Sequence, residues 1–143
     1  MKPRIFFVDS SFIYALLNQR DEFHSQALLV NNKFQDNDQF VLTDAIVFES
    51  CSLLAALEAR ESISDFFDDI MMSDQYLIIH TDVDLFNQAY DTFKGYKDKE
   101  WSLVDCLSFL VMQEQGIKYA LTADRHFEQM GFIAGLRTPE FIG

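Results

Sequence analysis

The segment Trp101–Phe132, WSLVDCLSFLVMQEQGIKYALTADRHFEQMGF, joins two helical patterns through a short strand. Ser102–Gln115 has apolar residues at helical spacing, and Tyr119–Thr122 is a short β-rich run. Asp124 follows that run and precedes a short helix that ends near Gly131. A strand between two helices predicts one unit of an alternating α/β fold.

The rest of the chain shows the same alternation. The other predicted strands are Arg4–Val8, Gln39–Thr43 and Tyr76–His80, with a short fifth strand near Phe132–Ile133. The other predicted helices are Ser10–Gln19, Glu22–Phe34, Asp44–Ala59, Ser62–Met72 and Val83–Phe93. This pattern predicts a three-layer α/β/α fold with a short central parallel sheet of four to five strands.

The composition predicts one domain over residues 1–143. About half of the chain is hydrophobic (49%), with fifteen Phe, which is typical of a compact globular protein. Proline occurs only at Pro3 and Pro139 and glycine is scarce, so no linker divides the chain.

Four carboxylates stand alone in apolar surroundings: Asp9, Glu49, Asp105 and Asp124. Removing an ionised carboxylate from water costs several kcal/mol unless positive charge meets it. The surrounding apolar runs contain no Lys or Arg at a spacing that could supply this charge. Asp9 and Asp124 follow predicted strands, and Glu49 lies in the second turn of a helix that follows a strand. Asp105 is three residues into its helix and faces back towards its beginning. All four can therefore converge on one end of the sheet, where ligands bind in such folds.

A shared metal ion is the counter-charge that fits these acids. Carboxylate oxygens are preferred by Mg2+ and Mn2+, and such ions activate water for attack on phosphate esters. The three histidines and two cysteines show no zinc-binding spacing. The pattern therefore predicts a metal-dependent hydrolase acting on phosphate esters.

Helix capping is the alternative role for three of these acids. Asp9 and Asp124 could each cap the helix that follows, and Ser102-Leu-Val-Asp105 matches a capping box with Asp in place of Glu or Gln. Glu49, in the second turn of its helix, has no such alternative. Two hydroxyls, Ser11 and Ser102, could steady neighbouring carboxylates or serve as ordinary first-turn serines.

The net charge of −12 is unusual for a protein that binds nucleic acid. Bound divalent cations would offset part of it. A weak basic cluster near the acids, which could contact RNA or could equally be a solvated loop face, consists of Lys94, Lys97, Lys99 and Arg125.

The chain carries no membrane or export signal that we recognise. Its apolar runs are shorter than the roughly eighteen residues of a membrane helix, and Asp9 interrupts the apolar stretch near the N-terminus. Cys51 and Cys106 lie in predicted helices and are expected to be reduced core residues. We therefore expect a cytoplasmic protein.

Three segments resemble the PIN domain, a family of metal-dependent ribonucleases that includes the VapC-type toxins of toxin–antitoxin pairs. FFVDSSFIYALL followed by DEFHSQA is similar to the family's first strand, first acid and helix pair. The helix bearing Glu49 resembles the setting of the second acid. Residues 101–132 are similar to the third-acid helix, the strand and the TxDxxF turn.

This resemblance implies an endoribonuclease that uses Mg2+ or Mn2+, acts on RNA, forms a homodimer and, in toxin members, binds a cognate antitoxin. It assigns the metal site to Asp9, Glu49, Asp105 and Asp124, with Ser11 and Ser102 as supporting hydroxyls. The family often has a further polar residue after the fourth acid, and His126 and Glu128 occupy that region here.

Two other functions are alternatives to an active nuclease. A degenerate PIN domain would act in RNA processing or only bind partners, although all four acids are present. A phosphoacceptor signalling domain would need an acceptor Asp at the end of the middle strand. Here Thr81 and Asp82 lie slightly beyond Tyr76–His80, and the expected late Lys and early acidic pair are missing.

Overall fold

The computed structural model describes residues 2–142, and its strands form one parallel sheet in the order β3-β2-β1-β4-β5. The strands are β1 (Ile5–Val8), β2 (Gln39–Thr43), β3 (Tyr76–Ile79), β4 (Tyr119–Leu121) and β5 (Ile133–Ala134). The helices are α1 (Ser10–Leu17), α2 (His24–Asn31), α3 (Asp44–Leu53), α4 (Leu57–Met72), α5 (Val83–Gly95), α6 (Leu103–Gln115) and α7 (Arg125–Gln129), followed by a 3-10 turn, Pro139–Ile142. The predicted parallel α/β architecture is confirmed.

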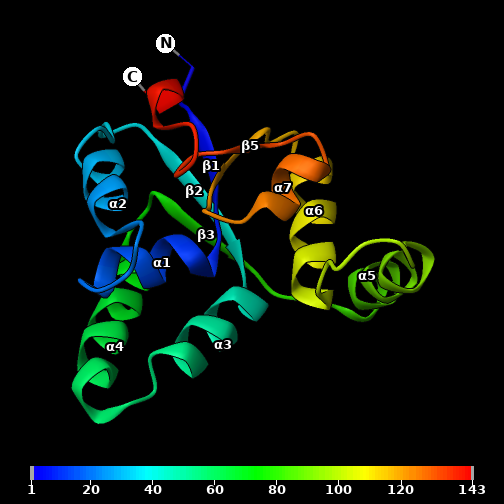
Figure 1. Cartoon of the computed structure of the whole chain (residues 1–143), viewed down its shortest axis with the longest axis horizontal. Coiled ribbons are helices and arrows are strands. Elements are labelled where there is room, and N and C mark those ends of the chain that lie inside the picture. Colours follow the sequence, from blue (N-terminus) through cyan, green and yellow to red (C-terminus); the bar gives the residue numbers. More distant parts are fainter. Residues whose placement is uncertain (1, 143) are drawn as a thin grey trace.

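The helices lie on both sides of the sheet (Figure 1). On one side are α1, α2 and α4, and on the other are α6 and α7, with α5 packed against α6. Helix α3 extends from the carboxyl end of β2 and contacts α1. No helix within residues 2–142 combines the length and apolar character needed to cross a bilayer.

The central strand β1 lies in the middle of the hydrophobic core. Phe6, Phe7 and Val8 are all buried, as expected for a parallel strand covered on both faces. On the α6 side, Phe127 of α7 packs against Phe7 and meets Phe109 of α6 edge-to-face at 5.0 Å between ring centroids. This aromatic packing fixes α7, and with it the residues that begin that helix.

The pairing of β1 with β4 brings distant residues together at one end of the sheet. Phe7 pairs with Ala120 and Val8 with Leu121. The backbone N–H of Asp9 continues this ladder by donating to the Leu121 carbonyl at 3.1 Å. Asp9 and the residue after Leu121 therefore leave the sheet side by side.

The structure corrects the predicted break between the third and fourth helices. The sequence predicted helices Asp44–Ala59 and Ser62–Met72, whereas α3 ends at Leu53 and α4 begins at Leu57. The intervening residues favour helix locally, but burial of Leu54 in the core redirects the chain, and Ala56 is extended. The loop before α2 is also longer than predicted, because the Asp21 side chain accepts a hydrogen bond from the Phe23 N–H and forms a turn.

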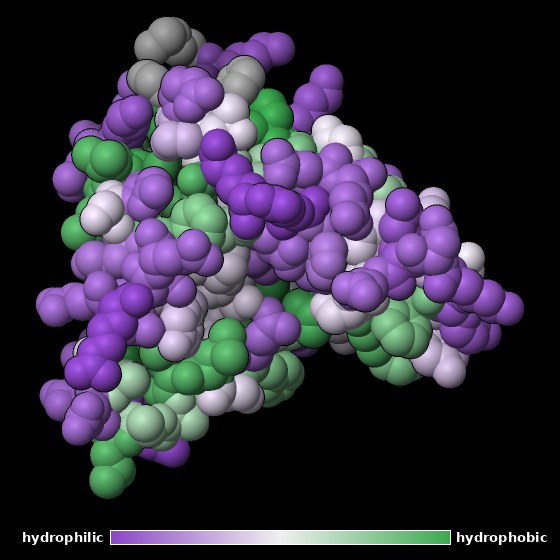
Figure 2. Space-filling view, viewed as in Figure 1, coloured by the Kyte–Doolittle hydropathy of each residue, from purple (hydrophilic) through white to green (hydrophobic). Residues whose placement is uncertain are grey.

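The cysteine prediction is correct for one residue only. Cys106 is buried in α6, as expected, and Cys51 is exposed on α3. Cys51 was assigned to the core because its neighbours in sequence are apolar. Helix α3 projects beyond the sheet, so several of these apolar residues are themselves exposed, and hydrophobic surface is visible at this end of the molecule (Figure 2).

Candidate active site

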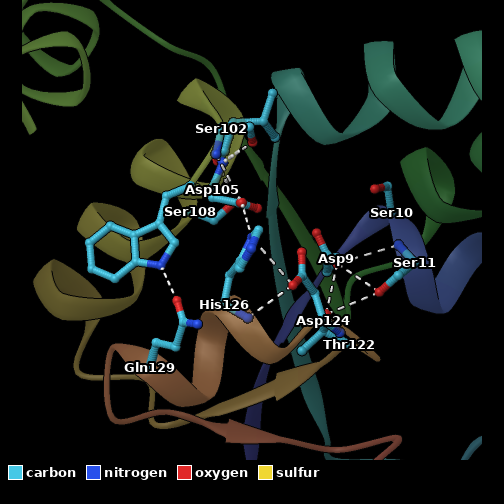
Figure 3. Close-up of polar contacts among 12 residues, drawn as sticks. Asp9, Ser10, Ser11, Ser102, Asp105, Ser108, Thr122, Asp124, His126 and Gln129 are labelled. Atoms are coloured by element: carbon cyan, nitrogen blue, oxygen red, sulfur yellow. Dashed lines mark hydrogen bonds and ion pairs between the residues drawn. The ribbon is translucent and has the colours of Figure 1, made fainter. Parts of the chain in front are cut away.

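Asp9 is held by two hydroxyl groups from different elements (Figure 3). Its Oδ2 accepts hydrogen bonds from Ser11 Oγ at 2.7 Å and from Thr122 Oγ1 at 2.8 Å. Each hydroxyl also accepts a backbone N–H, Ala123 to Ser11 and Asp124 to Thr122, both at 3.0 Å. The two hydroxyl oxygens also lie 3.0 Å from each other, so Ser11, Thr122 and Asp9 form one hydrogen-bonded cluster that orients the carboxylate.

Asp105 caps the start of α6 and also faces the other acids of the candidate site. The Ser102 hydroxyl accepts from the Asp105 N–H at 3.0 Å, and Asp105 Oδ2 accepts from the Ser102 N–H at 3.1 Å. The capping box is therefore real, with Asp in place of the usual longer acid. The same Oδ2 also lies 2.8 Å from His126 Nδ1. Capping turns the carboxylate towards the site, so the two roles are compatible.

Asp124 caps the start of α7 and faces the same imidazole. Its Oδ1 accepts from the His126 N–H at 2.9 Å and lies 3.4 Å from His126 Nδ1. Ligand atoms of Asp105, Asp124 and His126 all lie within 4.8 Å of one another. Figure 3 shows the imidazole between the two carboxylates.

Glu49 reaches the site through a neighbouring serine. It is half-buried on α3, and its Oε1 accepts a hydrogen bond from Ser10 Oγ at the start of α1. The group of three ligand atoms around His126 does not include Glu49 or Asp9. The structure thus brings Asp105 and Asp124 closest together, with Asp9 next to them and Glu49 beyond Ser10.

Each of the four predicted acids keeps one carboxylate oxygen without a hydrogen-bond partner in residues 2–142. Asp9, Asp105 and Asp124 are each held through a single oxygen, and Glu49 is held through Oε1 alone. None of the free oxygens is sealed away from solvent. Fixed carboxylates with accessible free oxygens are a donor set that fits a hard divalent cation.

The electrostatics of the site show unbalanced negative charge. Burial raises the pKa of Asp9 to about 6, with further contributions from the charges of Asp105 and Glu49, although its two hydroxyl partners oppose the rise. Partial burial disfavours protonation of His126, but the hydrogen bond to Asp105 and the nearby acids outweigh it and raise the pKa of the imidazole. Within residues 2–142, His126 is the one side chain that forms ion pairs with any of the four acids.

A cavity of about 630 Å³ is lined by Asp124 and by Ser10 and Ser11, the serines that contact Glu49 and Asp9. Of the predicted RNA-contacting cations, Arg125 lines it and the three lysines do not. Lys94 pairs with Asp91 at 3.6 Å, and Lys99 pairs with Asp98 at 3.7 Å. The lysines therefore belong to a separate exposed surface near the end of α5.

Three residues that contact the acids were not among the predicted site residues: Ser10, Thr122 and His126. Thr122 could have been found, because it precedes Asp124 by two residues just as Ser11 follows Asp9 by two. His126 was noted but given no role. No sequence pattern indicates a role for Ser10, since its contact with Glu49 depends on how α1 packs against α3.

Residues 6–133 match the PIN domain family. The chain belongs to the PIN domain family. The resemblance seen in the sequence is thereby confirmed, and the matched region contains all four acids.

Named relatives of this PIN domain come from Mycobacterium tuberculosis. It is 29% identical over 135 residues to the 23S rRNA-specific endonuclease VapC20, in strains CDC 1551 and H37Rv, covering 89% of this chain and 95% of that protein. The crystal structure of VapC20, described as a sarcin-ricin loop cleaving toxin, superposes with a TM-score of 0.79 at 28% identity. That match covers 90% of this chain and 96% of VapC20.

Proposed function

We propose that this PIN domain is an endoribonuclease that depends on Mg2+ or Mn2+ and acts as the toxin of a toxin–antitoxin pair. The observation that carries the proposal is the set of four acids, each fixed through one oxygen and open at the other. The similarity to VapC20, over nearly the whole of both chains, supports cleavage of RNA as the reaction.

Asp9, Asp105 and Asp124, with Glu49, would hold the divalent cation through their free oxygens. When bound, the cation supplies an activated water and neutralises charge on the phosphate. Ser11 and Thr122 keep the Asp9 carboxylate in one orientation, which preserves its free oxygen for binding.

His126 has a positioning role in this proposal. Its Nδ1 donates to Asp105, and its backbone N–H donates to Asp124. His126 therefore fixes the position of Asp105 relative to that of Asp124. The alternative of a degenerate PIN domain is less well supported, because all four acids are present and supported by hydrogen bonds.

The proposed partners are an antitoxin and a second copy of the chain. A basic antitoxin side chain placed among the four acids would satisfy their charge in place of the cation. For the homodimer, an apolar groove of about 250 Å³ lies between α3 and α5 and is lined by exposed Phe48 and Phe86. An RNA substrate and an antitoxin partner both suit the cytoplasm.

Cleavage of RNA by the purified protein is the deciding test. RNA of mixed sequence, ribosomal RNA and intact ribosomes would each be incubated with Mn2+ or Mg2+, with chelator as the control, and cut ends would be mapped. Ribosomal substrates are included because the named relative acts on 23S rRNA. Metal-dependent cuts at defined positions are expected. Absence of cleavage on all three substrates by the folded, metal-loaded protein would refute the proposed activity.

A further inference from the structure

Arg137 reaches the site because the chain continues along β4 after β5 ends. The Gly135 N–H donates to the Ala120 carbonyl at 2.8 Å, and the Leu136 N–H donates to the Thr122 carbonyl at 3.0 Å. Glycine is needed at position 135, since a Cβ there would lie 2.7 Å from the Tyr119 ring. Arg137 therefore lies at the same end of the sheet as the acids.

The Arg137 guanidinium is held beside the acid Asp124 by two contacts. Its Nε donates to the carbonyl of Ala123, the residue before Asp124, at 2.5 Å. Its Cζ lies 5.3 Å from the centre of the Phe23 ring, a cation–π contact. Neither Nη atom has a hydrogen-bond or ion-pair partner in residues 2–142. A pre-positioned guanidinium with two free donor groups is suited to bidentate binding of a phosphate.

The cavity beside the acids connects this arginine to the candidate active site. Arg137, Arg125 and Asp124 all line it, together with Tyr14 and Phe23. Arg125 has no side-chain hydrogen bond or ion pair in the described part of the chain. The volume of about 630 Å³ is in the range of sites that enclose small ligands, enough for a nucleotide-sized group.

We propose that Arg137 and Arg125 form a phosphate-binding subsite that positions the RNA chain next to the four acids. The inference rests on the proposed ribonuclease function and adds residues to it. Arg137 lies beyond residues 6–133, the part that matches the family, so the match itself does not provide this residue. Arg137 binds the substrate phosphate in this proposal, and the four acids keep their proposed role of holding the cation.

The overall charge makes such a subsite necessary. At a net charge of −12 the protein repels RNA at long range, so binding depends on local cations close to the reacting phosphate. Tyr14 and Phe23 add aromatic surface on which an unstacked base could pack. An acidic peptide is the less favoured ligand, because Asp21 and Glu22 oppose any anion alike, whereas only RNA offers bases that can pack on these two rings.

The test measures RNA binding in chelator, so that metal and cleavage play no part. Labelled single-stranded RNA of mixed sequence would be titrated with each protein at several salt concentrations, and anisotropy would give the affinity. We expect Arg137→Ala to weaken binding about tenfold and to lower the salt slope by about 0.7, the value for one lost contact with a single-stranded phosphate. Arg125→Ala should act in the same direction.

Two further variants keep the result interpretable. Arg137→Lys retains the charge but loses the planar fork, and we expect an intermediate affinity. Arg60→Ala is the matched control, because Arg60 is exposed on α4 and does not line the cavity. Equal salt slopes for wild type, Arg125→Ala and Arg137→Ala would overturn the proposal, as would an Arg60→Ala defect of the same size or wild-type protein that binds no RNA in chelator.

Failure of the subsite and failure of the proposed function give different results. If wild type cleaves RNA with Mn2+ while the arginine variants bind RNA normally, the subsite is wrong and the nuclease assignment stands. If wild type never cleaves RNA but the variants lose RNA binding, the subsite stands and the nuclease assignment is wrong. If the variants lose only the binding of a partner protein, the cavity is a protein-docking site and the proposal is overturned.

Discussion

The Thr122 hydroxyl donates a hydrogen bond to Asp9 Oδ2, with 2.8 Å between the two oxygens, and this contact joins residues that are 113 positions apart in the sequence. The hydroxyl also receives the Asp124 N–H, so one side chain is bonded to two of the four acids. Thr122 is completely buried, and no other described residue bridges Asp9 and Asp124 in this way. Its removal should therefore disturb the site more than removal of an exposed hydroxyl.

The first prediction concerns Thr122→Val, which keeps the side-chain shape and removes the hydroxyl. We expect about 1–3 kcal/mol of destabilisation because the Asp124 N–H loses its acceptor, together with weaker Mn2+ binding measured by calorimetry. Thr122→Ser should retain most of the affinity. Equal Mn2+ affinity in Thr122→Val and wild type would show that this hydroxyl does not orient Asp9.

The second prediction separates metal binding from helix capping. Asn caps a helix about as well as Asp but is a poorer ligand for a hard cation. Asp9→Asn and Asp105→Asn should therefore fold normally by circular dichroism and lose cleavage activity. Cleavage at the wild-type rate by either variant would remove that acid from the proposed site.

The third prediction is that divalent cations stabilise the folded protein. The four acids repel one another when no cation is bound, and a cation that binds the folded state alone raises stability by about 2.7 kcal/mol at a hundred times its dissociation constant. Thermal scans should show Tm rising by roughly 5–10 °C with millimolar Mn2+. The Asp9→Asn protein is the control and should respond much less. An unchanged wild-type Tm would contradict a shared site.

The fourth prediction concerns pH in the absence of metal. A folded-state pKa of Asp9 raised from 3.8 to about 6 means that, between these values, the folded protein keeps a proton that the unfolded chain has lost. Stability from this group is therefore full below pH 4 and falls as pH rises through about 6, by on the order of 3 kcal/mol. The raised pKa of His126 acts in the same direction, with stability lost as pH rises through it.

Urea unfolding in chelator would measure this pH effect. Other acids contribute their own pH dependence, so the informative quantity is the difference between wild type and Asp9→Asn. That difference should grow in favour of Asp9→Asn as pH increases from about 4 to above 6. A constant difference over this range would mean that Asp9 titrates normally in the folded protein.

The sequence predicted the fold where local pattern and burial agree. Strand β2 has the predicted bounds, Gln39–Thr43, because its apolar run is framed by polar residues and by Asp44, which begins the next helix. The break after Leu53 was placed wrongly because no Gly or Pro marks it. The chain turns there with Leu54 buried in the core, a tertiary contact that the local pattern does not contain.

Residues of the candidate site could be predicted where their chemistry differs from that of their neighbours in sequence. A lone acid in an apolar run is visible without a structure, which is why Asp9 and Glu49 were identified. Partners such as Ser10 and Arg137 have ordinary neighbours in sequence. Their roles arise from packing of α1 against α3 and from the path after β5, neither of which the sequence pattern contains.

The order of the strands has a consequence for synthesis of the protein. Strand β1 is made first but lies at the centre of the sheet, and its neighbour β4 is made more than a hundred residues later. A growing chain that has not yet reached Tyr119 cannot form the Thr122 contact with Asp9 or supply Asp124. Any nascent or truncated chain short of β4 should therefore lack nuclease activity, and catalytic competence should arise abruptly when β4 docks.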